Sequence, residues 1–134
     1  MPNGTLTVST HADKELINIT DTIEALCINQ PVSSGILSLF NPHTTAGLTI
    51  NEGADPEVCS DIIMGLEKMV PTLTYHHMEG NSPSHIMALL TGSSLTIHVE
   101  KGRLLLGTWQ KIFFCEFDGP RIRTIHWKYL PDHG

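Results

Sequence analysis

The sequence has few basic residues and no long apolar run. Only 8 of its 134 residues are lysine or arginine, against 14 aspartates and glutamates, and the formal net charge is -6. Because binding to a nucleic-acid backbone rests on a basic stripe, this balance argues against nucleic acid as a partner. No apolar run approaches the roughly 20 residues that span a bilayer, and the start of the chain lacks the basic and apolar regions of a signal peptide. We therefore expect a soluble, unexported protein without a membrane partner.

Cysteine is also scarce. Cys27, Cys59 and Cys115 are odd in number and far apart, which predicts reduced, partly buried thiols and a cytoplasmic location rather than a disulfide framework. Cys115 lies in IFFCEF, whose large apolar residues are typical of an inert core thiol. The sequence contains no G-x-S-x-G elbow, Walker loop or dinucleotide fingerprint. Nucleophilic hydrolysis and the binding of nucleoside triphosphates or NAD are therefore not expected.

The pattern of apolar residues predicts one α+β domain over residues 1–134, a length that a single core can serve. Alternation predicts strands at 4–10, 14–20, 35–41, 46–52, 94–100, 103–109, 111–117 and 121–130. Helical spacing and capping residues predict helices at 20–29, at 56–69, and from a cap at Ser82 to Gly92. We expect the first two strands to pair with each other and the last four to form an antiparallel meander. The fold class is thus a sheet-rich α+β domain with antiparallel strands and two to three helices.

Histidine is the residue that the sequence has in excess, with eight copies. His43, His76, His77 and His85 lie on predicted turns or helix starts, where functional groups are often carried. Adjacent side chains of an extended segment point opposite ways, so His76 and His77 cannot easily serve one centre. Three neutral imidazoles around an open position would bind Zn²⁺ or a similar ion, but the spacing from His77 to His85 is not a recognised ligand pair. From spacing alone, a metal site and a polar loop both remain open.

Acidic residues lie near these histidines in the sequence. Glu52 and Asp55 belong to the turn TINEGADP, and Glu79 lies inside the histidine-rich segment. Such carboxylates can orient a ligand, act as a base on bound water, or cap a helix. Pro56 follows Asp55, which favours the cap for that residue, whereas a role at a metal site and a structural role stay equally open for Glu52 and Glu79.

Two segments could hold an anionic group. The predicted helix start GNSPSH offers backbone amides and a favourable dipole, and HTTAG offers two hydroxyl groups. Arg121 and Arg123 fall on one face of the last strand, where they could contact phosphate or form a charged sheet edge. The candidates for binding such an anionic group are Thr44, Thr45, Gly80, Asn81, Ser82 and Arg121.

Three phrases of the sequence stand out, namely NPHTTAGLTINEGADP, HMEGNSPSHI and SSLTIHVEKGRLLLGTWQKIFFCEFDGPR. They closely resemble the YjbQ-like family, known as the secondary thiamine-phosphate synthase family, and GTWQ is the most recognisable part. The resemblance extends over almost the whole chain. It implies a compact α+β protein that assembles as a homotrimer and holds a divalent metal, often zinc, near a subunit boundary.

The same resemblance implies which histidines bind the metal. The family's histidine positions fall on His43, His77 and His85 in this sequence, and His76 is then the bystander. Imidazole also binds copper, nickel and iron, so we expect a divalent metal, with zinc as the first candidate.

The activity implied by the resemblance is weak transfer of a pyrimidine pyrophosphate onto a thiazole phosphate. The acidic positions of the family fall on Glu52 and Asp55, which are the catalytic candidates. We therefore expect a phosphorylated small molecule as substrate and a transferase as one possible function. The alternatives are a non-catalytic trimer that binds metal or anions, and a metal-dependent hydrolase with Glu52 as its base.

Overall fold

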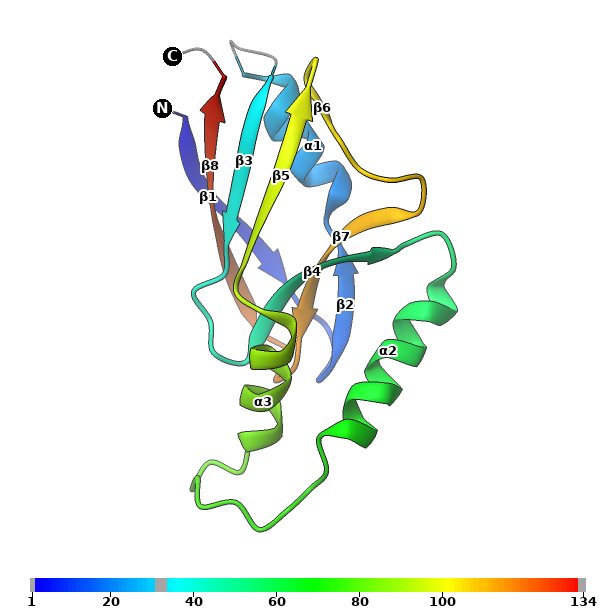
Figure 1. Ribbon diagram of the computed structural model, residues 1–134. Helices are drawn as coiled ribbons and strands as arrows, with labels where there is room; N and C mark the ends of the chain where they lie inside the picture. The colour runs from blue at the N-terminus through cyan, green and yellow to red at the C-terminus, as the bar shows by residue number, and fades with distance from the viewer. Residues whose placement is uncertain (1, 31–33, 133–134) are drawn as a thin grey trace.

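Antiparallel strands and three helices make up the computed structural model, which describes residues 2–30 and 34–132 (Figure 1). The strands are β1 (Asn3–Ser9), β2 (Glu15–Asn18), β3 (Gly35–Phe40), β4 (Ala46–Glu52), β5 (Ser94–Glu100), β6 (Arg103–Leu104), β7 (Gln110–Glu116) and β8 (Ile122–Pro131). The helices are α1 (Thr20–Ile28), α2 (Pro56–Met69) and α3 (Ser82–Thr91). One sheet has the strand order β1-β8-β3-β5-β6, and the other has the order β2-β7-β4.

The main core lies between the two sheets. Leu37 and Ile125 from the larger sheet and Leu48 and Phe114 from the smaller one are fully buried in the same apolar cluster. Burying a side chain of this kind stabilises the fold by about 1.5–3 kcal/mol. Ile23 of α1 joins the cluster with no exposed surface. The sheets are therefore held face to face by side chains that alternate along each strand.

A second apolar cluster lies on the other face of the smaller sheet. Phe113, Cys115 and Phe117 pack there with Met87 of α3, and Leu66 of α2 packs against the cluster. Since Ile112 and Phe114 face the main core, β7 is buried on both faces, which accounts for the apolar run KIFFCEF. Burial raises the pKa of Cys115 to about 12. All three cysteines are free in the structure, with Cys27 and Cys115 buried and Cys59 partly buried.

The predicted strand partners are wrong in two places. β1 pairs with β8 and β2 pairs with β7, so the first two strands belong to different sheets. Among the last four strands, only β5 and β6 are neighbours, and the strand predicted at 103–109 shortens to two residues. Alternation of apolar residues determines which face a strand buries, whereas the partner depends on contacts between distant parts of the chain. The predicted meander does not form.

The fold class is as predicted: one α+β domain with antiparallel sheets and three helices in the described residues. α2 spans the predicted residues, and α3 begins at Ser82 because Asn81, not Ser82, occupies the capping position. Figure 1 shows α3 close to the loop that connects β3 to β4. None of the helices in this part of the chain combines the length and apolar composition needed to cross a membrane.

Candidate functional site

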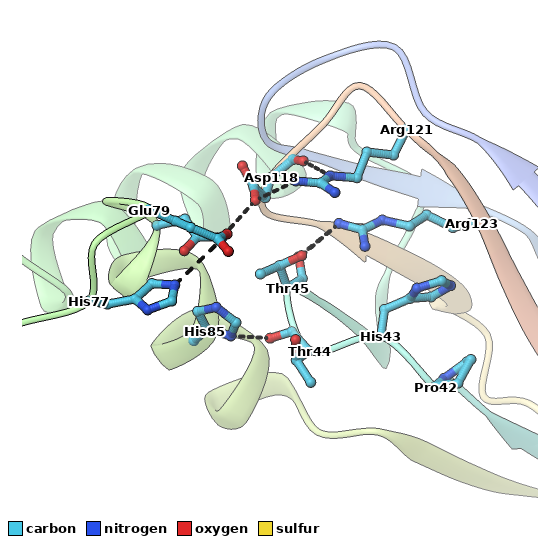
Figure 2. A pocket seen from close by; sticks show the side chains of 11 residues that line it. Pro42, His43, Thr44, Thr45, His77, Glu79, His85, Asp118, Arg121 and Arg123 are labelled. Carbon is cyan, nitrogen blue, oxygen red and sulfur yellow. Dashed lines mark hydrogen bonds and ion pairs between the residues drawn. The ribbon is translucent and has the colours of Figure 1, made fainter.

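A pocket of about 400 Å³ lies where the β3–β4 loop, the start of α3 and the β7–β8 turn meet (Figure 2). Its lining residues are Pro42, His43, Thr44, Thr45, His77, Glu79, Asn81, His85, Asp118, Arg121 and Arg123. The fold thus brings together all three histidines of the predicted metal site. Four of the six predicted substrate-binding residues line the same pocket, and Gly80 and Ser82 do not.

Gly80 lies just before α3, and Ser82 is the first residue of that helix. Gly80 has a φ of 76°, a left-handed conformation that favours glycine, and its amide donates to the carbonyl of His77. The amides of Ser84 and His85 both donate to the carbonyl of Asn81, and Pro83 has no N–H to offer. The helix start therefore offers an anion fewer free amides than the sequence suggested.

His85 is held in a defined orientation by the β3–β4 loop. Its Nδ1 lies 3.1 Å from the carbonyl oxygen of Thr44, which can only accept, so Nδ1 carries the proton. In the neutral ring, Nε2 is then left with a free lone pair. Metal-binding histidines commonly have this arrangement, in which the second ring nitrogen donates to a carbonyl or carboxylate. His85 is thus set up as a ligand or as a base.

His77 lies beside His85 but on a more exposed segment. The two ring centroids are 5.5 Å apart and the planes meet at 83°, an edge-to-face arrangement. The Nε2 atom of His77 is 3.9 Å from Oε2 of Glu79. Figure 2 shows both imidazoles at the same side of the pocket, across from the arginines. These two histidines can serve one centre.

His43 differs from the other two histidines. Its Nε2 accepts a hydrogen bond of 2.9 Å from the backbone amide of Thr124, so the neutral ring must carry its proton on Nδ1. Burial lowers the pKa of His43, and the positive charge of Arg123 lowers it further, which keeps the ring neutral. In this arrangement His43 offers an N–H group, not a lone pair.

The residues present fit a metal only in part. His77 and His85 can each turn an imidazole nitrogen toward a shared ion, but the lone pair of His43 is occupied by Thr124. Within residues 2–30 and 34–132, no three histidine, cysteine, aspartate or glutamate side chains lie close enough together to hold a metal ion. Because catalytic zinc sites use three protein ligands, a third ligand must come from beyond this set.

A buried ion pair forms the back wall of the pocket. Arg123 is 4% exposed and Glu116 is fully buried. The guanidinium donates to both carboxylate oxygens, through Nε at 2.9 Å to Oε1 and through Nη2 to Oε2. Glu116 also accepts from the hydroxyl of Thr10 at 2.7 Å and from the amide of Asp118 at 3.0 Å. Burial raises the pKa of Glu116, but these donors outweigh it, so the pKa lies below 4.5 and the carboxylate is ionised.

Arg121, the arginine predicted to bind substrate, lies at the rim of the pocket. It donates to the carboxylate of Asp118 at 2.9 Å and to its carbonyl at 2.7 Å. The side chain of Arg121 is 53% exposed, so solvent screens this ion pair. Asn81 donates to the same carboxylate at 3.0 Å, which connects the β7–β8 turn to α3.

The two catalytic candidates lie elsewhere in the chain. Glu52 is the last residue of β4 and pairs with Gln110, whereas the pocket lies at the other end of the strand, where Ala46 pairs with Glu116. Six steps along a strand cover about 20 Å. The amide of Asp55 donates to the Glu52 carboxylate at 3.0 Å. Within one chain, therefore, Glu52 and Asp55 do not reach the histidine pocket, and this geometry does not support Glu52 as the base of a hydrolase.

Comparison with known proteins identifies the family. The family described as UPF0047 protein YjbQ-like matches residues 4–132, which is nearly the whole chain. The chain belongs to this family. The YjbQ-like resemblance of the three sequence phrases is thereby confirmed.

Two relatives of this UPF0047 protein match it over more than nine tenths of their own lengths. UPF0047 protein YugU of Bacillus subtilis is 44% identical over 128 residues, covering 94% of this chain and 97% of the relative. A UPF0047 protein of Methanocaldococcus jannaschii is 47% identical over 126 residues, covering 93% and 91%.

Solved structures have the same fold. The crystal structure of a conserved yjbq/upf0047 family protein from Clostridium acetobutylicum has a TM-score of 0.90 and 47% identity, and the match covers 94% of this chain and 98% of that one. A YbjQ-like protein of unknown function from Sulfolobus solfataricus has a TM-score of 0.92 and 31% identity, with coverage of 98% and 97%. The architecture that surrounds the pocket is therefore that of the UPF0047 family.

For this UPF0047 protein, we predict that Asp55 contributes to stability through helix capping. Its carboxylate accepts the amide of Glu57 at 2.9 Å at the start of α2. Asp55→Ala should lower the free energy of unfolding by about 1 kcal/mol, whereas Asp55→Asn should cost only a few tenths because asparagine also caps. Urea unfolding of the three proteins measures this difference. An Asp55→Ala protein as stable as the wild type would contradict the capping role, whereas a stable Asp55→Asn protein that has lost its turnover would indicate a catalytic one.

Proposed function

We propose that this UPF0047 protein is a metal-dependent transferase for phosphorylated small molecules, with the weak thiamine-phosphate synthase activity that its YjbQ-like resemblance implies. In that reaction, the bond from the pyrimidine methylene carbon to pyrophosphate breaks, and a bond from that carbon to the thiazole nitrogen forms. The observation that carries the proposal is the lining of one pocket by three imidazoles and two guanidinium groups. Such a lining suits a departing pyrophosphate, whose charge must be stabilised as it leaves.

The charges around the pocket support the involvement of a cation. Arg121 and Arg123 contribute two positive charges, while Asp118, Glu79 and the Glu116 behind them contribute three negative charges, which leaves -1 when the imidazoles are neutral. A phosphoryl group adds further negative charge to this sum. A divalent metal held by His77 and His85 would balance that charge and act as a Lewis acid toward phosphoryl oxygen.

The protein's own groups would orient the reactants. The carbonyl of Thr44 fixes the ring of His85, and Asn41, which is buried, fixes the β3–β4 loop by donating to the carbonyl of Ala46 at 2.7 Å. A fixed loop and helix hold two reacting partners in one geometry, which lowers the entropic cost of their meeting.

We further propose that the protein assembles as a homotrimer in which Glu52 completes the pocket of a neighbouring copy. Next to Glu52, the amide of Gly53 donates to the carbonyl of Trp109, a residue that is 63% exposed. At the pocket end, Met78 beside His77 is fully exposed and Leu89, one turn beyond His85, is 79% exposed. Exposed apolar groups at two different ends favour a head-to-tail contact, which closes into a ring. Glu52 of the next copy would then supply the third metal ligand.

The metal site is tested by His85→Ala and His77→Ala. Outer-shell partners of a metal contribute about 10–100-fold to its affinity, so losing a direct ligand should cost at least as much. We therefore expect both variants, purified without a tag, to lose their metal by elemental analysis. They should also lose the formation of thiamine phosphate from the two precursors.

His76→Ala is the matched control, because His76 is on the same segment and does not line the pocket. It should keep both metal and turnover. Metal retained in the His77 and His85 variants would remove the proposed metal site. Absence of thiamine phosphate with the wild-type protein would remove the transferase.

A further inference from the structure

Arg123 is the most deeply buried cation at the pocket, and it lies between the two sheets. It belongs to β8 of the larger sheet, while Glu116 belongs to β7 of the smaller one. Thr45, just before β4, adds a third contact, because its hydroxyl and carbonyl accept from Nη2 of Arg123 at 2.9 and 3.3 Å. The guanidinium is thus held in one position by groups from two segments other than its own strand.

One nitrogen of this guanidinium remains available. Nε and Nη2 donate to Glu116 and Thr45. In the described residues, Nη1 of Arg123 donates to no group, and it is not among the atoms shut off from solvent without a partner. Because Arg123 lines the pocket, its remaining exposed surface lies there. Figure 2 shows the head of Arg123 directed toward Thr45, between Asp118 and His43.

His43 adds a second fixed donor beside Arg123. The Thr124 amide occupies Nε2, so the Nδ1–H of the neutral ring is the group that His43 can offer a ligand. Two donors that are already oriented pay little to reorganise when an oxyanion arrives. The guanidinium of Arg121, in contrast, is held in the described residues only by Asp118 of its own turn, and the side chain is 53% exposed, so its orientation is fixed less firmly.

We propose that Arg123 and His43 are the donors that hold a phosphoryl oxygen in this pocket, with Arg123 as its anchor in place of Arg121. The proposal rests on the proposed function in one respect, namely that the ligand carries a phosphoryl group. It assigns His43 to the substrate and leaves the metal to His77 and His85. In this proposal, Glu116 acts through Arg123, because its carboxylate positions the guanidinium that binds the phosphoryl oxygen.

The matched variants Arg123→Lys and Arg121→Lys test the anchor. Inorganic phosphate is titrated into each protein as purified, with no added metal, and binding is followed by NMR. Lysine cannot reproduce the fork that holds Nη1 in place. Losing a hydrogen bond to a charged group should weaken phosphate binding by about tenfold or more in Arg123→Lys, and by less than about threefold in Arg121→Lys.

A direct measurement covers the case in which Arg123→Lys fails to fold. In the wild-type protein, phosphate should shift the guanidinium resonances of Arg123 and leave those of Arg121 nearly unchanged. His43→Ala should weaken phosphate binding while its metal content stays that of the wild type. Equal losses in the two lysine variants, or a shift confined to Arg121, would overturn the assignment, as would loss of metal from His43→Ala.

The test of the phosphate anchor can be told apart from the test of the transferase activity. Phosphate binding through Arg123 without any thiamine phosphate formed would keep the anchor and remove the proposed reaction. Turnover together with phosphate binding that is unchanged in Arg123→Lys would keep the proposed reaction and remove Arg123 as the anchor.

Discussion

Glu116→Ala should lower the free energy of unfolding by about 3–5 kcal/mol, because it leaves the Arg123 guanidinium buried without a counter-ion. Glu116 has no exposed surface and receives hydrogen bonds from Arg123, Thr10 and the Asp118 amide. Its removal takes an acceptor from each of these donors, and in the described residues Thr10 and Arg123 keep only their bonds to Arg121 and Thr45, which adds to the cost. Urea unfolding followed by circular dichroism measures the effect, with the protein concentration held constant because association also stabilises the fold.

Two further variants separate the buried pair from ordinary charge effects. Glu24→Ala breaks the pair of Glu24 with Arg103, which are 3.8 Å apart with Arg103 80% exposed, and should cost about 0–1 kcal/mol. Replacing Glu116 by Leu and Arg123 by Met together removes both buried charges and should recover much of the loss. A Glu116→Ala protein within about 1 kcal/mol of the wild type would show that the pair does not hold the sheets together.

The loss in Glu116→Ala should itself depend on pH. The pKa of Glu116 in the folded protein lies below 4.5, its ordinary value, because its hydrogen-bond donors outweigh the effect of burial. A carboxylate of this kind stabilises the fold fully above its unfolded pKa and loses that contribution as the pH falls through the folded pKa. The difference in unfolding free energy between wild type and variant should therefore be constant near neutral pH and shrink in acid below 4.5.

Those parts of the fold could be predicted from the sequence that are determined by residues close together in the chain. α2 begins after Asp55 because that side chain caps it and Pro56 suits its first position, so both signals lie within two residues of the helix start. Strand partners have no such local cause. Asn3 pairs with Lys128 in the register of β1 and β8, and such contacts form only when distant segments meet. The predicted pairing of the first two strands failed for this reason.

The candidate site could be predicted in part for the same reason. His77 and His85 belong to one short segment, but the pairing of Arg123 with Glu116 joins two strands of different sheets. Sequence reasoning missed Glu116, although a carboxylate inside the apolar run IFFCEF is itself a signal, since a buried charge needs a partner. Alternation alone also could not separate Arg121 from Arg123, because it assigns both to one face.

Mixing two inactive variants should restore activity if Glu52 acts on a neighbouring copy. Glu52 and His85 lie toward opposite ends of β4 in one chain, so Glu52→Gln and His85→Ala damage different halves of the proposed shared site. In a head-to-tail ring formed from equal amounts of both variants, a site has one chance in two of intact histidines and one in two of an intact Glu52. Co-expression should therefore give roughly one quarter of the wild-type metal content and turnover.

A second pair of variants makes this test specific to the geometry. His77→Ala mixed with His85→Ala should stay inactive. Both histidines of a site come from the same chain, so every site lacks one of the two. If the mixture of Glu52→Gln and His85→Ala is as inactive as its parents, Glu52 does not serve a neighbour. If Glu52→Gln alone keeps its metal and its turnover, Glu52 has no part in the site at all. Restoration in the first pair and not in the second requires that the two ends of β4, about 20 Å apart in one chain, meet across a subunit boundary.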